Sequence, residues 1–128
     1  MAATGSGFLT PRPPLVAPDA AVAVHAVTAA LVIGDYGKNI TNTGSAATAT
    51  LTLLAAKDAA GLSFRIQQTV AQITRLLPAT GEAICLGGNV VVTKYLNIAA
   101  VIGNYVDVYC DGERYLVTGY SGVVTKEA

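Results

Sequence analysis

From residue 20 onward, apolar and polar side chains alternate with a period near two, and glycine, asparagine and aspartate residues interrupt the alternation at short intervals. Successive side chains of a β-strand point to opposite faces, so this pattern is typical of a series of short strands. Thr48, Thr50 and Thr52 alternate with alanine and leucine. Because threonine favours a pleated, half-buried surface, we expect a strand here with a threonine outer face.

The alternation resumes after an expected turn at 57–61. Leu62, Phe64 and Ile66 point one way, and the polar residues between them point the other. Further strands are expected near 23–33, 71–77, 82–86, 90–92 and 96–102. The apolar residues of 67–77 also fit helical spacing, so a short helix is the alternative to the strand that we favour there.

The sharpest local signal is the pair Asp111-Gly112, which lies between two alternating segments. An Asp-Gly pair tolerates the positive φ angles of a two-residue type I′ turn, so it predicts a β-hairpin over 105–117. A turn at this place fixes the register of both strands. The expected partners are Cys110 with Glu113, Val108 with Tyr115, and Val106 with Val117.

Short strands with glycine-rich turns predict an all-β fold, a single β-sandwich or small barrel of jelly-roll-like form, over residues 20–128. Residues 1–19 differ because they hold four of the five prolines, and proline neither donates to a strand ladder nor continues a helix. We expect an extended Pro-rich N-terminal arm. It is either a free tail or a segment that lies on a neighbouring subunit.

The surface of this chain has few charges. Charged residues make up 12% and hydrophobic residues 52%, and eight basic residues balance eight acidic ones. The basic residues are spread singly, which argues against nucleic-acid binding because that function needs a concentrated positive surface. A surface so poor in charge favours burial against other chains, so we expect a homo-oligomer.

Residues with catalytic or metal-binding chemistry are few and scattered. The single histidine, His25, has apolar neighbours, which favour a packed histidine over a general base. The GDYGK segment at 34–38 lacks the spacing of a phosphate-binding loop, and LPATG at 77–81 lacks the hydrophobic span and basic tail of a sortase signal. No metal-site spacing is present. We expect no enzyme, cofactor, metal or small-molecule substrate, and a small hydrolase is the least favoured alternative.

Two cysteines, Cys85 and Cys110, are too few for a disulfide scaffold. We expect two buried, reduced thiols. The apolar segment 20–34 is shorter than the roughly 20 apolar residues of a membrane span. A signal peptide has positive charge at its start, whereas this chain begins MAATGSGF and its Arg12 lies among prolines. We therefore expect neither a membrane partner nor export.

Three segments carry a family resemblance: ITNTGSAATATLTL at 40–53, AGLSF at 60–64 and VYCDGERYLVTGYSGVV at 108–124. Together they resemble small β-rich structural modules of tailed bacteriophages, which occur as capsid decoration proteins and as head or tail fibre domains. The likeness spans roughly 38–125 and leaves the proline-rich arm unmatched. It implies a β-rich module, commonly trimeric, that binds the outside of a capsid or forms part of a fibre. It carries over no functional residue.

We therefore expect a capsid decoration (cement) protein that is made in the host bacterial cytoplasm and stabilises the exterior of the virion. Its partners would be its own copies, as a homotrimer, and the major capsid protein. The alternative is a fibre or receptor-binding module that contacts a host surface glycan or protein. The capsid-contact candidates lie in the arm and are Phe8, Leu9, Arg12, Leu15 and Val16. The surface aromatic candidates lie in or near expected loops and are Tyr36, Tyr105 and Tyr120.

Overall fold

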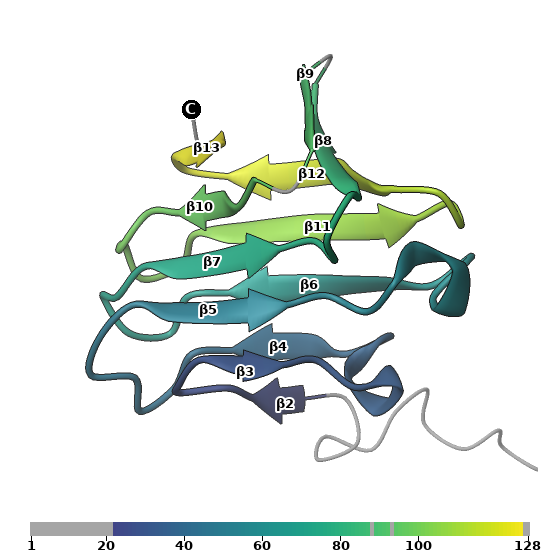
Figure 1. Cartoon of the computed structure of the whole chain (residues 1–128). Helices are drawn as coiled ribbons and strands as arrows, with labels where there is room; N and C mark the ends of the chain where they lie inside the picture. The colour runs from purple at the N-terminus through teal and green to yellow at the C-terminus, as the bar shows by residue number, and fades with distance from the viewer. Residues whose placement is uncertain (1–21, 88, 93, 127–128) are drawn as a thin grey trace, which may run out of the picture.

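The computed structural model describes residues 22–87, 89–92 and 94–126. The fold is all-β, with 44% strand and 6% helical residues, and no α-helix occurs in the described ranges. The helical residues form two short 3-10 turns, η1 (Ile33–Asp35) and η2 (Ala56–Asp58). The strands form two mixed sheets, which lie in two layers (Figure 1). The all-β prediction is confirmed.

The first six described strands alternate between the two sheets. The seven-stranded sheet contains β2 (Val22–Val24), β4 (Asn39–Thr41) and β6 (Ser63–Gln67), paired in parallel. The five-stranded sheet contains β3 (Ala29–Ala30), β5 (Ala49–Thr52) and β7 (Thr74–Leu77), also paired in parallel. The chain thus winds through three coils, β2–β3, β4–β5 and β6–β7, and each coil adds one strand to each sheet (Figure 1).

The second half of the chain continues both sheets, mostly by antiparallel pairing. On the five-stranded sheet, β7 is followed by β10 (Leu96–Ile98) and β13 (Val124–Lys126). On the seven-stranded sheet, β6 is followed by β11 (Tyr105–Cys110) and β12 (Tyr115–Ser121). The hairpin β8 (Ala83–Leu86) and β9 (Asn89–Val92) joins through β8, which pairs parallel to β12. Figure 1 shows this hairpin standing away from the two layers.

The core lies between the sheets and follows the alternation of the sequence. Phe64 and Ile66 are buried and their neighbours Ser63 and Arg65 are exposed, as expected. Leu62 was expected on the same inward face, but it precedes β6 and is exposed. On β5, the inward residues are fully buried and the threonines are half-buried, which confirms the threonine outer face. The two layers share one core cluster, which includes Ile40, Leu51, Phe64, Ile66, Leu76, Ile98, Val106, Val108 and Tyr115.

The hairpin register differs from the prediction. Asp111 Oδ1 accepts hydrogen bonds from the backbone N–H groups of Glu113 and Arg114, at 2.8 and 2.9 Å. This makes the connection a four-residue loop, 111–114, so Cys110 pairs with Tyr115 and Val108 with Val117. The side-chain hydrogen bonds of the aspartate override the two-residue turn that Asp-Gly predicts. From Cys110 back to Val108 the shift is two residues, so the same side chains still face the core. Val106, expected opposite Val117, pairs with Tyr120, because the register shifts once more between Asp107 and Val108.

Three other expectations are corrected or resolved. The strand expected near 23–33 is two short strands, because the chain crosses from one sheet to the other between them. Segment 67–77 contains the strand β7 and no helix. The jelly-roll-like detail is wrong: of the ten strand pairs in the described ranges, five are parallel, whereas jelly rolls are antiparallel. The predicted arm, 1–19, lies outside the described residues.

Candidate functional site

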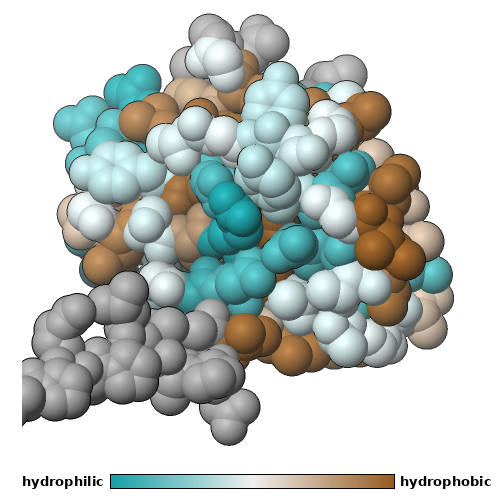
Figure 2. All heavy atoms as spheres, turned by 180° about the vertical axis from the view of Figure 1, so that it is seen from behind, coloured by the Kyte–Doolittle hydropathy of each residue, from teal (hydrophilic) through white to brown (hydrophobic). Residues whose placement is uncertain are grey.

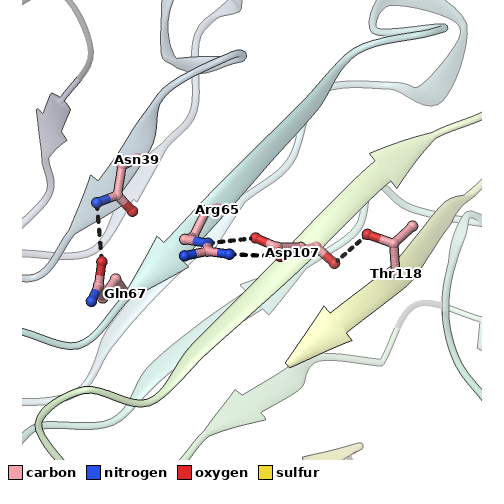
Figure 3. Close-up of polar contacts among 5 residues, drawn as sticks. All are labelled: Asn39, Arg65, Gln67, Asp107 and Thr118. Carbon is pink, nitrogen blue, oxygen red and sulfur yellow. Dashed lines mark hydrogen bonds and ion pairs between the residues drawn. The ribbon is translucent and has the colours of Figure 1, made fainter. Parts of the chain in front are cut away.

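The outer face of the seven-stranded sheet carries a polar groove of about 430 Å³. Strand register places Asn39, Arg65 and Asp107 opposite one another on β4, β6 and β11 (Figure 3). Figure 2 looks onto this side of the molecule, where hydrophilic side chains gather at the centre. The groove is lined by Gly37, Lys38, Asn39, Ser63, Phe64, Arg65, Asp107, Val108 and Thr118.

An arginine–aspartate pair forms the floor of this polar groove. Arg65 Nε and Nη2 donate to the two carboxylate oxygens of Asp107 at 2.7 and 3.0 Å. The guanidinium carbon also lies 4.1 Å from the ring centre of Tyr105. The hydrogen bonds with Asp107 raise the pKa of Arg65 above its ordinary value. The fork and the ring contact together hold the guanidinium in one orientation.

A β-bulge shapes the β12 wall of the groove. The register between β11 and β12 shifts between Asp107 and Val108, which pair with Gly119 and Val117 and leave Thr118 as the extra residue. Thr118 lines the groove, and its hydroxyl donates to the backbone carbonyl of Asp107 at 3.3 Å (Figure 3). Bulges re-aim side chains and are frequent beside functional sites. The sequence alternation gave no sign of this bulge.

The three tyrosine candidates do not form one surface. Tyr36 was expected on an exposed loop, but it is buried, with 8% of its surface exposed. Its ring packs edge-on against Phe64, at 5.1 Å between centres, because the η1 turn directs it into the core. Tyr105 is half-buried beneath Arg65, and Tyr120 is 52% exposed near the end of β12. Of the three candidate tyrosines, only Tyr120 is exposed as the sequence predicted.

His25 has a carboxylate neighbour that sequence reasoning missed. Its Nε2 lies 3.2 Å from Asp35 Oδ1, and Asp35 Oδ2 accepts a hydrogen bond from the Val32 amide at 2.9 Å. The contact lacks hydrogen-bond geometry at Nε2. A catalytic triad would need a nucleophile bonded to the ring, and no such bond to His25 is recorded within the described ranges. The histidine is packed at the start of the first coil.

Apolar side chains are exposed where the stack of coils begins. We call this surface, which comprises β2, β3, the segment between them and η1, the stack end. Its exposed residues are Val22, Val24, Val27, Val32 and Ile33, each between 41% and 71% exposed. Residues 22–34 include no Lys, Arg, Asp or Glu. Within the described residues, β2 and β3 are the outermost strands of their sheets at this end.

A second apolar surface, the loop tip, joins two turns. Val101 and Ile102 precede β11, and Val123 lies between β12 and β13; they are 57%, 66% and 61% exposed. The amide of Ala99 donates to the carbonyl of Val123 at 3.1 Å, which keeps the two turns together. Hydrophobic side chains are visible along one side of the face in Figure 2.

The capsid-contact candidates Phe8, Leu9, Arg12, Leu15 and Val16 lie outside the described residues. In the described ranges, no three His, Cys, Asp or Glu residues group as metal ligands, and no helix is long and apolar enough to cross a membrane. No known protein family, curated protein or solved structure matches this chain.

Proposed function

We propose that this protein is an assembly module of a tailed bacteriophage virion, a capsid decoration protein that docks to its own copies and to the major capsid protein. The observation that carries the proposal is the stack end, where two sheet edges and five exposed aliphatic side chains meet without a charged residue in 22–34. Soluble proteins usually protect exposed strand edges with charges or proline. An edge without either is suited to pairing with another chain.

The energetics of the stack end favour docking. Fully burying a valine or isoleucine contributes roughly 1.5–3 kcal/mol, so a side chain that is about half exposed contributes roughly 1 kcal/mol. Five such residues offset a substantial part of the free energy that association costs, on the order of 4–15 kcal/mol. Backbone hydrogen bonds at the sheet edges would add to this contribution.

Two separate apolar surfaces suit a ring of identical subunits. The stack end lies on β2, β3 and η1, whereas the loop tip lies on the turns before β11 and β13. A two-fold dimer joins one surface to itself, while a head-to-tail contact joins two different surfaces and closes into a ring when the rotation permits. The homotrimer is the proposed ring.

Shell binding would stabilise the capsid by mass action, because a ligand that binds only the assembled state shifts the equilibrium towards it. The test is to mix the full chain with expanded, undecorated capsids and to measure co-sedimentation. Saturable binding at a fixed stoichiometry supports the proposal. Free protein in the supernatant at every concentration would overturn it.

A second candidate is a fibre or receptor-binding module that contacts a host surface glycan. The polar groove favours it, because a concave site with a few oriented polar groups is the usual form of a small-ligand site. The two candidates use different surfaces. The groove lies at the middle of the seven-stranded sheet, and the stack end lies at its edge.

A further inference from the structure

We infer that the polar groove binds a sugar that carries a carboxylate, of the uronic-acid type. The inference names the ligand class of the second candidate function and rests on that candidate, not on capsid docking. Three properties of the groove support it: an excess positive charge, oriented groups for sugar hydroxyls, and a size that suits one sugar ring.

The net positive charge of the groove favours an anionic ligand. Lys38 and Arg65 are its two cations, and Asp107 is its one carboxylate. Asp107 already engages Arg65 through both oxygens. No hydrogen bond or ion pair is recorded for the half-buried Lys38 side chain within the described ranges. Lys38 is therefore the cation that remains for an anionic group of the ligand.

The net charge of the groove favours a carboxylate over a phosphate. Its two cations and one carboxylate leave one net positive charge, which one ligand carboxylate balances, whereas a phosphate group carries close to two negative charges at pH 7. In Arg65, Nε and Nη2 donate to Asp107, and Nη1 remains for a ligand.

The groups around the Arg65–Asp107 pair suit hydroxyl recognition. Each carboxylate oxygen of Asp107 accepts one bond from Arg65 and retains a lone pair for a ligand O–H. Ser63 adds a hydroxyl that both donates and accepts, and the bulge directs Thr118 to the same wall. Because the fork and the Tyr105 ring hold Arg65 in place, little side-chain freedom is lost on binding.

The dimensions agree with a single ring. A volume of about 430 Å³ lies in the lower part of the range for small-ligand sites, roughly 300–1,000 Å³. The groove lies on an exposed sheet face, so a sugar within a longer chain can enter without a change in the fold.

The test is a titration of the isotope-labelled full chain with glucuronate, followed by backbone amide shifts. Glucose and acetate serve as comparison probes, since one lacks the carboxylate and the other lacks the ring. We expect saturable shifts at the groove residues with glucuronate, weaker binding of glucose and still weaker binding of acetate. Equal shifts from acetate and glucuronate, or none at the groove, would overturn the inference.

Single-residue variants test what each groove residue contributes to sugar binding. Lys38→Gln should weaken glucuronate binding by up to about fivefold, to the level of glucose, because an exposed ion pair contributes little more than that. Asp107→Ala should weaken glucose, because it removes hydroxyl acceptors, and Thr118→Val should weaken both sugars. The matched control, Lys57→Gln, removes an exposed lysine on η2 outside the groove and should change neither. If Lys38→Gln binds glucuronate as the wild type does, the charge assignment is wrong. The same variants are also tested for co-sedimentation with capsids. This measurement distinguishes a failure of sugar binding from a failure of the assembly proposal.

Discussion

The hydroxyls of Tyr36 and Tyr115 meet at 2.7 Å inside the core and close a ring of hydrogen bonds with the backbone of Leu54. Tyr115 Oη donates to the Leu54 carbonyl at 2.8 Å, and the Leu54 amide donates to Tyr36 Oη at 3.1 Å. Because Tyr115 uses its own proton on the Leu54 carbonyl, Tyr36 Oη is the donor in the bond between the two hydroxyls. This ring joins the turn before β4, the end of the second coil and the start of β12.

Replacing Tyr115 with Phe should therefore destabilise the fold. The change leaves the partly buried Leu54 carbonyl without its donor and the Tyr36 hydroxyl without its acceptor, which costs about 1–3 kcal/mol. Thermal unfolding should show a melting temperature lower by several degrees. Tyr109→Phe is the matched control, because the Tyr109 side chain is 38% exposed and should tolerate the change. Equal melting temperatures for the two variants would contradict the hydrogen-bond account.

The same pair predicts the response to alkaline pH. Burial raises the pKa of both Tyr36 and Tyr115 above the ordinary value of 10.0. The unfolded chain then releases these protons at a lower pH than the folded chain, so their contribution is complete below pH 10 and is lost as the pH rises further. Denaturant titrations from pH 9 to 11.5 should show a decline that is shallower in Tyr115→Phe than in the wild type.

Gly122 is the least replaceable of the turn glycines described. A Cβ there would lie 2.0 Å from Asn104 Oδ1, and Asn104 is itself buried. Gly61 has the same φ of +82° but open space around it, which makes it the matched control. Gly61→Ala should cost only the strain of a positive φ, about 1–2 kcal/mol. Gly122→Ala should cost roughly 1–3 kcal/mol more in denaturant unfolding, from overpacking.

The cysteines should behave as separate thiols. Cys85 and Cys110 are both free and buried, as the sequence predicted. Cys110 donates weakly to the carbonyl of Ala56 at 3.2 Å, and burial raises the pKa of its thiol, which keeps it protonated and unreactive. A reductant should leave the melting temperature of the wild type unchanged. A large fall on reduction would reveal a disulfide that the structure lacks.

The arm can be tested by deletion. The fully buried core residues begin at Leu31, so removing 1–17 should leave the two sheets folded. We expect the truncated chain to keep its circular dichroism spectrum and to lose capsid binding, because Phe8, Leu9, Leu15 and Val16 would have supplied apolar contact area. Binding as tight as that of the full chain would make the arm a passive tail.

Periodicity in the sequence predicted the elements better than their connections. Within β5 and β6, alternation identified inward and outward residues correctly, because side-chain direction there depends only on local pleating. Leu62 lies outside β6, and its inward placement was wrong. Parallel pairing of β4 with β6 depends on which sheet each strand joins, and alternation is the same in either case. The prediction therefore gave strands and an all-β class but not the coils.

The groove was less predictable still. Arg65 and Asp107 are 42 residues apart and meet through strand pairing. A register shift at the β11–β12 bulge adds Thr118.

The aspartate at 111 carried a turn signal in the sequence, but its side-chain bonds set a four-residue loop that the Asp-Gly pair alone does not indicate. Tyr36 was placed on a loop because nothing local marks its turn into the core.

If the exposed aliphatic residues of the stack end join one subunit to the next, the mass of the protein in solution will show it. Light scattering should give about 39 kDa for the wild type, three copies of 13.0 kDa, and a value near 13.0 kDa for Val24→Lys. The lysine places a charge on the exposed edge strand without touching the core. Leu62→Lys, an exposed aliphatic residue away from the stack end, should stay trimeric. A wild type of 13 kDa at every concentration, or equal masses for wild type and Val24→Lys, would contradict the account.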